Sequence, residues 1–348
     1  MLIHGLWGEW NDWNNFKPLV KGKASVDQRF HVERVSYDWD IGSTISSSIP
    51  QYTAASMSNA KANSMGVQYV TPHVLTQVAK AIEKFKSGDN PVNLPVASVQ
   101  VDVIAHSMGG VITRTLPLTP GFFSHTLGQG IIHKVISIDV PHLGSPLAAQ
   151  LLDATADCTR GLLAGKGNVT FNSVNFTKAP NTPVSGGTGD MVNSPMSSVL
   201  NAISNPGPRP LPTALIAGVY TNFASLDCTT NFFGYPCAAY YIQKTCGPQG
   251  DLMAAKFNST SWPLIFGPTG NNPNDAIVGQ TSQLNGLAIT SGTDGFIYGG
   301  LVHSPGTTKL SFTGPTVLDS SSTNPVADQV ITLLNTPYTQ LAFHSLNP

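Results

Sequence analysis

The hexapeptide AHSMGG, from Ala105 to Gly110, constrains the fold of this chain more than any other feature. It follows the apolar run 96–105, expected to be a strand buried on both faces, and precedes residues 109–115, expected to begin a helix. A serine on a sharp strand-to-helix turn is a nucleophile elbow, G-x-S-x-G, here with Ala replacing the first Gly. Such a turn raises the Ser107 hydroxyl above the sheet edge and directs the Met108 N–H toward a developing oxyanion. The alternative is a serine that only caps a helix.

Other segments of the chain support the same kind of fold. The first 150 residues alternate strand-like and helix-like segments, which predicts a mostly parallel sheet with helices on both faces, an α/β architecture. The expected strands are 34–39, 131–140, 213–220 and 295–302, and the expected helices include 71–86 and 325–334.

The middle of the chain differs in composition, because it is rich in Gly, Ser, Asn and Pro and has few long apolar runs. We interpret it as an irregular cap or lid threaded between the last strands of the core. The expected organisation is a first core part at 1–150, a cap insertion at 151–212, a core strand at 213–220, a second cap segment at 221–272 and a C-terminal core part at 273–348.

A serine hydroxyl needs a base, and the base needs an acid to orient it. In this fold the chain order is Ser, then acid, then His, so only His303 and His344 of the nine histidines come late enough. His303 follows an expected strand, whereas His344 lies near the C-terminus, where order is often poor. We predict His303 as the base and Asp275 as the acid. Asp139 and Asp294 are the alternatives, and Asp294 fits better as a turn residue.

A second oxyanion donor should come from the loop after an early strand. Here that loop is LIHGLWG over residues 2–8, and the backbone N–H of Leu6 is the candidate. Gly5 would allow its backbone to approach the nucleophile closely.

Charge argues against several kinds of partner. The chain has 18 Lys and Arg residues, 19 Asp and Glu residues and a net charge of −1, which does not support binding to nucleic acid.

Motifs for membrane spans and cofactors are missing from the sequence. It contains no run of about 18 apolar residues, so no membrane span is indicated. No cofactor motif is present: there is no P-loop, no dinucleotide-binding glycine pattern and no H-E-x-x-H.

The cysteines bear on the compartment. Cys158, Cys228, Cys237 and Cys246 contain no C-x-x-C pair, and their pairing cannot be chosen from the sequence. We expect at least one disulfide and therefore an oxidising compartment, and the alternative is four buried thiols. No signal peptide is visible and only three residues precede His4, so we interpret the chain as the mature fragment of a secreted precursor.

Five blocks carry a resemblance to a known superfamily. They are HGLWG at 4–8, VDVIAHSMGGVITR at 101–114, PHLGSPLA at 141–148, NDAIVGQTSQ at 274–283 and VHSP at 302–305. The chain resembles the α/β-hydrolase superfamily, and within it the bacterial lipases and esterases whose elbow begins with Ala. The resemblance implies Ser107 as nucleophile, Asp275 as acid, His303 as base, and Leu6 and Met108 as oxyanion donors.

The resemblance also implies an activity. It predicts a serine ester hydrolase, a lipase or carboxylesterase, that cleaves lipid-like esters through an acyl-enzyme. The alternatives are an acyltransferase with the same triad and a non-catalytic binding protein of this fold. The expected partner is a small-molecule or lipid ester, with transient contact to a lipid interface, and the expected state is a monomer. No cofactor is expected. A structural calcium ion is an expectation by analogy with some lipases, with no ligands assigned.

Overall fold

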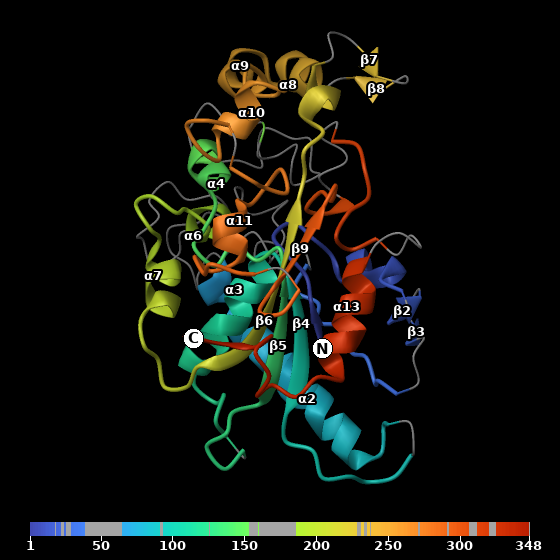
Figure 1. Ribbon diagram of the computed structural model, residues 1–348. Coiled ribbons are helices and arrows are strands. Elements are labelled where there is room, and N and C mark those ends of the chain that lie inside the picture. Colours follow the sequence, from blue (N-terminus) through green and yellow to red (C-terminus); the bar gives the residue numbers. More distant parts are fainter. Residues whose placement is uncertain are drawn as a thin grey trace.

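The structure is a computed structural model, with one central sheet flanked by helices and a group of short helices beyond one end of its strands (Figure 1). It describes residues 1–17, 19–21, 24–25, 29–38, 65–90, 93–124, 126–152, 159, 186–227, 231–232, 235–236, 238–270, 272–290, 292–305, 312–319 and 325–347. No helix within these ranges is both long and apolar enough to cross a bilayer.

Within the described ranges, the central sheet has six strands in the order β1, β4, β5, β6, with β9 and β10 both paired to the far edge of β6. The strands are β1 (Leu2–Ile3), β4 (Val101–His106), β5 (Ile132–Ile138), β6 (Leu211–Val219), β9 (Phe296–Gly299) and β10 (His344–Leu346). β9 runs parallel to the C-terminal half of β6, and β10 runs antiparallel to its N-terminal half. Every other pair in the sheet is parallel, so the carboxyl ends of β1, β4, β5, β6 and β9 meet at one edge.

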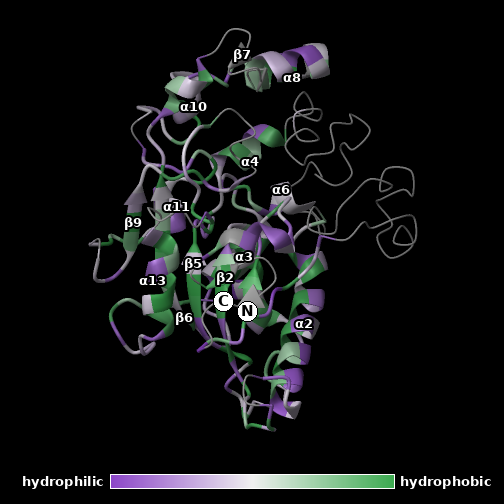
Figure 2. Ribbon diagram, turned by 90° about the vertical axis from the view of Figure 1, so that its right-hand side faces the viewer, coloured by the Kyte–Doolittle hydropathy of each residue, from purple (hydrophilic) through white to green (hydrophobic). Residues whose placement is uncertain are grey.

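Helices cover both faces of the sheet (Figure 2). One face carries α2 (Val67–Ser87), α3 (Met108–Thr115) and α7 (Ser198–Ser204), and the other carries α13 (Pro325–Leu334) and the 3-10 helix η1 (Trp10–Asn15). Successive side chains of a strand point to opposite faces. In β4, Val103 and Ala105 therefore pack with α2 and α3, while Ile104 packs with α13. The strand predicted at 96–105 is thus wrong in its first half, because residues 96–100 form no strand and Val99 is 47% exposed, and burial on both faces holds only from Val103 to His106.

Most of the elements expected from the sequence are present. The predicted helix at 71–86 lies within α2, and the predicted helix at 325–334 coincides with α13. The strands predicted at 131–140, 213–220 and 295–302 correspond to β5, β6 and β9, with shorter or shifted ends. The fold class, an α/β sheet with helices on both faces, is confirmed.

Two further expectations were wrong. Residues 34–38 form no strand. Their pairing with the sheet is limited to one parallel bridge, between Arg34 and Leu2. The reason is that β1 has only two residues, so it pairs with this segment through two backbone hydrogen bonds. The N–H of Leu2 donates to the carbonyl of Glu33 at 2.8 Å, and the N–H of Val35 donates to the carbonyl of Leu2 at 2.9 Å. His344 is ordered rather than in a loose end, because it lies in β10 and its ring donates to the carbonyl of Asp294.

Part of the predicted cap packs with the core. Among the described residues of 151–212, α6 (Gly186–Asp190) contacts α2 and α7 contacts α3, and Val199, Leu200 and Ile203 belong to the core cluster. This packing follows from the apolar face of α7. A second cluster does lie beyond the carboxyl ends of the strands (Figure 1). Its helices are α4 (Pro146–Leu151), α8 (Ala238–Cys246), α9 (Asp251–Ala254) and α10 (Ser261–Leu264).

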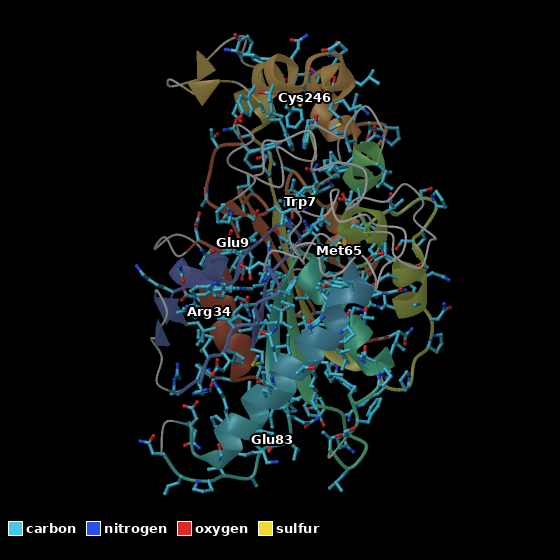
Figure 3. The ribbon with its side chains drawn as sticks, turned by 180° about the vertical axis from the view of Figure 1, so that it is seen from behind. Trp7, Glu9, Arg34, Met65, Glu83 and Cys246 are labelled. Carbon is cyan, nitrogen blue, oxygen red and sulfur yellow. The ribbon has the colours of Figure 1, made fainter. Side chains whose placement is uncertain are left out.

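The cysteine expectation remains a prediction. Cys246 is buried at the end of α8 (Figure 3), and Cys158, Cys228 and Cys237 lie outside the described residues. Among the described residues no free cysteine is found.

A buried lysine attaches α13 to the sheet. The Lys134 ammonium donates to the carbonyls of Leu333 at 2.9 Å, Leu334 at 2.8 Å and Thr336 at 2.8 Å. These carbonyls belong to the end of α13, where backbone acceptors have no partner within the helix and a cation is favoured.

We therefore predict that Lys134→Met destabilises the fold. Loss of the donor leaves buried carbonyls without a partner, which should lower the free energy of unfolding by about 2 to 4 kcal/mol. Urea unfolding monitored by circular dichroism measures the change. Lys86→Met is the matched control, because Lys86 pairs with Glu83 on the surface and such pairs contribute about 0 to 1 kcal/mol. Equal effects in the two variants would contradict the role of Lys134.

Candidate active site

The turn between β4 and α3 is the predicted elbow. Ser107 joins His106, the last residue of β4, to Met108, the first of α3, with φ of 56° and ψ of −135°. This is an unfavourable conformation for a residue with a side chain. Glycines make the turn possible, because a Cβ on Gly109 would lie 2.3 Å from the His4 carbonyl oxygen. The requirement for small residues around the serine is thus steric.

Three predicted residues form one hydrogen-bonded chain. The Oγ of Ser107 lies 2.8 Å from Nε2 of His303, and Nδ1 of His303 lies 2.6 Å from Oδ2 of Asp275. An ionised carboxylate only accepts, so Nδ1 donates to it, and Nε2 of the neutral ring is left to accept the serine proton. Asp275 is fully buried, while Ser107 and His303 are 8% and 5% exposed. The arrangement suits proton transfer from serine to histidine.

The Asp275 carboxylate is held by its own loop. Its Oδ1 accepts from the backbone N–H groups of Ile277 at 2.8 Å and Val278 at 2.6 Å. Its backbone carbonyl accepts from the N–H of His303 at 3.0 Å. Ala276 has a positive φ of 79°, which lets the chain turn around the carboxylate. The negative charge is therefore placed opposite Nδ1 of the base.

The two alternative acids lie in different places. Asp294 is half-buried in a turn, and its backbone carbonyl accepts a hydrogen bond from the ring of His344. Asp139 follows β5 and is completely buried. One of its carboxyl oxygens lies within 4.8 Å of both a carboxylate oxygen of Asp275 and a ring nitrogen of His303. Burial, and then the nearby charge of Asp275, raise the pKa of Asp139 well above its ordinary value. The site thus has two carboxyl groups, and Asp275 is the one bonded to the histidine.

Sequence reasoning missed the role of His106. Its Nε2 donates to the backbone carbonyl of His303 at 2.8 Å, so it ties the loop of the base to the elbow of the nucleophile. Burial, and then the neighbouring His303, hold the pKa of His106 well below its ordinary value, so the ring stays neutral. The available signal was its place directly before the predicted nucleophile.

The loop after β1 passes directly over the nucleophile. A Cβ on Gly5 would lie 2.6 Å from Cβ and 3.0 Å from Oγ of Ser107. His4 shapes this loop, because its ring stacks on Tyr37 with centroids 3.9 Å apart and its carbonyl accepts from the Tyr37 hydroxyl. Trp7 follows with a positive φ of 58° and lies between the sheet and the cap (Figure 3).

The two predicted oxyanion donors remain available. Within the described part of the chain, the backbone N–H groups of Leu6 and Met108 donate no hydrogen bond. Unused N–H groups beside a nucleophile, one of them at a helix N-terminus, suit the stabilisation of a developing oxyanion.

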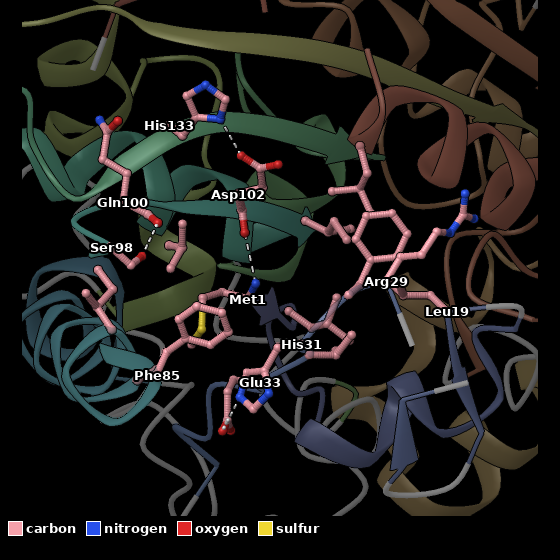
Figure 4. Close-up of a pocket in the computed structure, with 18 residues that line it drawn as sticks. Met1, Leu19, Arg29, His31, Glu33, Phe85, Ser98, Gln100, Asp102 and His133 are labelled. Carbon is pink, nitrogen blue, oxygen red and sulfur yellow. Dashed lines mark hydrogen bonds and ion pairs between the residues drawn. The ribbon is translucent and has the colours of Figure 1, made fainter. Parts of the chain in front are cut away.

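A separate cavity lies at the opposite end of the strands (Figure 4). Its volume is about 340 Å³, and its lining includes Met1, Phe85, Val101, Asp102 and His133. The Met1 amino group donates to the carbonyl of Asp102 at 2.8 Å inside it. Because Val101 and Asp102 begin β4 and Ser107 follows its end, this cavity is not part of the elbow site.

One cluster has the composition of a metal site. Among the described His, Cys, Asp and Glu residues, the one group close enough to share an ion is Asp139, Asp275 and His303. His303 and Asp275 are bonded to each other there, and calcium prefers six to eight oxygen ligands. The described residues therefore assign no ligands to the calcium ion expected by analogy.

A family model matches the part of the chain that carries the first half of the site. Residues 1–156 match the family model "Putative serine esterase (DUF676)". The matched range contains the loop after β1 and the elbow, and it ends before Asp275 and His303. The elbow and the chain order of Ser107, Asp275 and His303 agree with the pattern described for α/β-hydrolases. The predicted resemblance to that superfamily is thus confirmed. No curated protein sequence matches the chain.

Solved structures of lipases and esterases are similar at low identity. The mature form of lipase BlEst2 from Bacillus licheniformis is similar over 95% of this chain and 90% of its own, with 14% identity and a TM-score of 0.43. Lipase 1 from Pelosinus fermentans covers 94% and 97%, with 16% identity and a TM-score of 0.40. EstA from Clostridium botulinum covers 97% and 87%, also with 16% identity and a TM-score of 0.40.

Buried histidines make the stability dependent on pH. Burial lowers the pKa of His4 from 6.5 to about 4 and holds the pKa of His106 and His142 well below ordinary values. The folded chain then binds fewer protons than the unfolded chain below pH 6.5. The contribution of these histidines to stability should be complete above pH 6.5 and fall as the pH falls toward 4, with about 3 kcal/mol from His4 alone.

Urea unfolding at pH 8, 6 and 5 measures this slope. We expect His4→Gln to reduce this slope, since the substituted side chain takes up no proton, while His106 and His142 still contribute. Gln68→Ala, at an exposed position of α2, is the control, because it changes no titratable group, and it should keep the parental slope. Identical slopes for His4→Gln and the parent would contradict the assignment.

Close approach at Gly5 gives a prediction about the nucleophile. Gly5→Ala should displace the loop from Ser107 and slow the labelling of Ser107 by a fluorophosphonate by roughly 100-fold, because oxyanion donors contribute about that much. The labelling rate is read by mass spectrometry. Gly299→Ala is the control, because a Cβ there meets no atom within 4 Å. Unchanged labelling of Gly5→Ala would contradict the role of the loop.

Proposed function

We propose that the protein is a serine carboxylic-ester hydrolase that acts on lipid-like esters through an acyl-enzyme. The observation that carries the proposal is the hydrogen-bonded chain from Ser107 through His303 to Asp275. The family match to putative serine esterases supports the same reaction class.

The proposed reaction has two stages. Ser107 Oγ attacks the ester carbonyl while His303 Nε2 takes its proton, and the tetrahedral oxyanion binds to the N–H groups of Leu6 and Met108. The C–O bond then breaks, and His303 gives the proton to the leaving alcohol. A water molecule attacks the acyl-enzyme with His303 again as base, which releases the acid and restores Ser107. Asp275 stabilises the imidazolium in both stages, and the proposed steps need no cofactor.

A buried apolar cluster next to the site supports a lipid-like substrate. The cap cluster beyond the strand ends contains Leu147, Trp262 and Phe312, and Trp7 of the oxyanion loop packs against it. The part of the molecule beyond the elbow is therefore apolar, as suits an enzyme that acts on acyl chains.

The outer side of the cap supports contact with a lipid interface. Tyr240 and Tyr241 on α8, Leu252 on α9 and Leu264 on α10 are 40%, 45%, 58% and 48% exposed. Exposed apolar groups gathered on one region suggest a surface that binds another apolar surface. We propose that a monomer acts in an extracytoplasmic compartment and touches lipid transiently through this region.

Hydrolysis of p-nitrophenyl esters from C2 to C16 tests the activity. The parent should prefer C8 or longer chains, and a preference for C2 to C4 would mean a short-chain esterase instead. Ser107→Ala should lower kcat by roughly 10⁴-fold or more, as the loss of a nucleophile does elsewhere. Full activity in Ser107→Ala would refute the proposed nucleophile.

The interface contact has its own test. The double variant Tyr241→Asp, Leu252→Asp should lower the rate on emulsified triacylglycerol several-fold and leave the rate on a dissolved short ester unchanged. Leu127→Asp is the control, because Leu127 is 99% exposed but lies outside the cap. An equal loss on both substrates, or an equal loss in the control, would contradict a specific interfacial surface.

A further inference from the structure

The carboxyl group of Asp139 occupies a built position beside the triad that the proposed reaction does not use. Asp139 follows β5 with a positive φ of 50°, which is strained for a residue other than glycine. Its Oδ1 accepts from the backbone N–H of Gly218 on β6 at 2.5 Å. A Cβ at residue 218 would lie 2.8 Å from Oδ2, so a glycine is needed there. The surrounding backbone is thus shaped to this carboxyl group.

Two buried carboxyl groups this close do not both ionise. The negative charges would repel each other where water cannot screen them. Asp275 accepts two backbone N–H groups and the imidazole, and all three favour its charged form. Asp139 accepts one hydrogen bond, from the backbone N–H of Gly218 to its Oδ1, and among the described residues no group donates to its Oδ2. The charge therefore belongs on Asp275 and the proton on Asp139.

Among the described residues, no other charged group lies near enough to Asp139 to move the negative charge from Asp275 to Asp139. The facing titratable groups are Asp275 and His303. The neighbouring strand β4 brings His106 beside Ile138, and that ring is neutral. β6 contributes the backbone of Gly218, and Val140 packs on α3. Burial and the charge of Asp275 both raise the pKa of Asp139, in agreement with the geometry.

We propose that Asp139 is a second carboxyl group of the triad, neutral while Asp275 carries the charge and able to pair with His303 when Asp275 is lost. It is a positioning residue, because it acts on the base and its acid and not on the substrate. The effect on turnover rests on the proposed function, whereas its protonation does not.

Protonation is tested by stability, without any activity. The unfolded carboxyl group loses its proton above about pH 4, while the folded one keeps it, so rising pH destabilises the parent relative to Asp139→Asn. The Tm of Asp139→Asn minus that of the parent should increase by about 2 °C or more between pH 4.5 and 7.5. Asn201→Ala, at an exposed position of α7, removes no titratable group and should give a difference independent of pH. A flat difference for Asp139→Asn would overturn the proposal.

The pH dependence of kcat/KM gives a second readout. An amide replaces a neutral acid without a change in charge, so in Asp139→Asn the midpoint of the acid limb of the pH profile of kcat/KM should stay within about 0.3 pH unit of the parent. If Asp139 were ionised, its loss would remove a charge near His303 and move this limb down by about one pH unit or more. Such a shift would overturn the proposal.

Removal of Asp275 tests whether Asp139 can take its place as the partner of His303. Without that charge, Asp139 can ionise opposite His303, so Asp275→Ala should keep at least about 10-fold more kcat than the double variant Asp275→Ala, Asp139→Asn. Equal rates in the two variants, both melting cooperatively, would show that Asp139 does not replace Asp275. An inactive parent would refute the proposed function, and the Tm difference would still decide whether Asp139 is protonated.

Discussion

Close approach of backbone at the end of β4 is the constraint on which the rest of the structure depends. Gly109 lies so near the His4 carbonyl, and Gly110 so near the Val140 side chain, that a Cβ at either position would push α3 away from the segments after β1 and β5. With glycines there, the loop after β1, the elbow and the end of β5 pack against one another. Ser107 then stands between the oxyanion loop and the base, which come from opposite ends of the chain.

Strain is concentrated at this edge of the sheet. Four of the seven described non-glycine residues with positive φ lie in or beside the site, and they are Trp7, Ser107, Asp139 and Ala276. Such conformations cost roughly 1 to 3 kcal/mol each and persist only where the surrounding structure enforces them. Here the enforcing structure is a sheet buried on both faces, which gives the site a rigid base.

Neutral histidines, and the proton that we propose on Asp139, complete the electrostatics of the site. His4 and His106 are buried and uncharged, and they serve as hydrogen-bond and stacking partners for the loops that carry the reactive groups. The one fixed negative charge next to His303 among the described residues is on Asp275. A dry surrounding strengthens this interaction, and it also makes a second charge on Asp139 unfavourable. Burial thus accounts for two expectations: only one of the two carboxyl groups beside His303 carries a charge, and the fold loses stability at acid pH.

The sequence by itself determined the features that neighbouring residues encode. The apolar run ending at Ala105, the small residues around Ser107 and the chain order of serine, acid and histidine predicted the fold class and the nucleophile, because steric and periodic rules act over a few residues. Only the tertiary structure decided which acid bonds to His303, what His106 does and where residue 344 lies. Each depends on contacts between residues about 30 to 200 apart in the chain, and local patterns hold no information on such contacts.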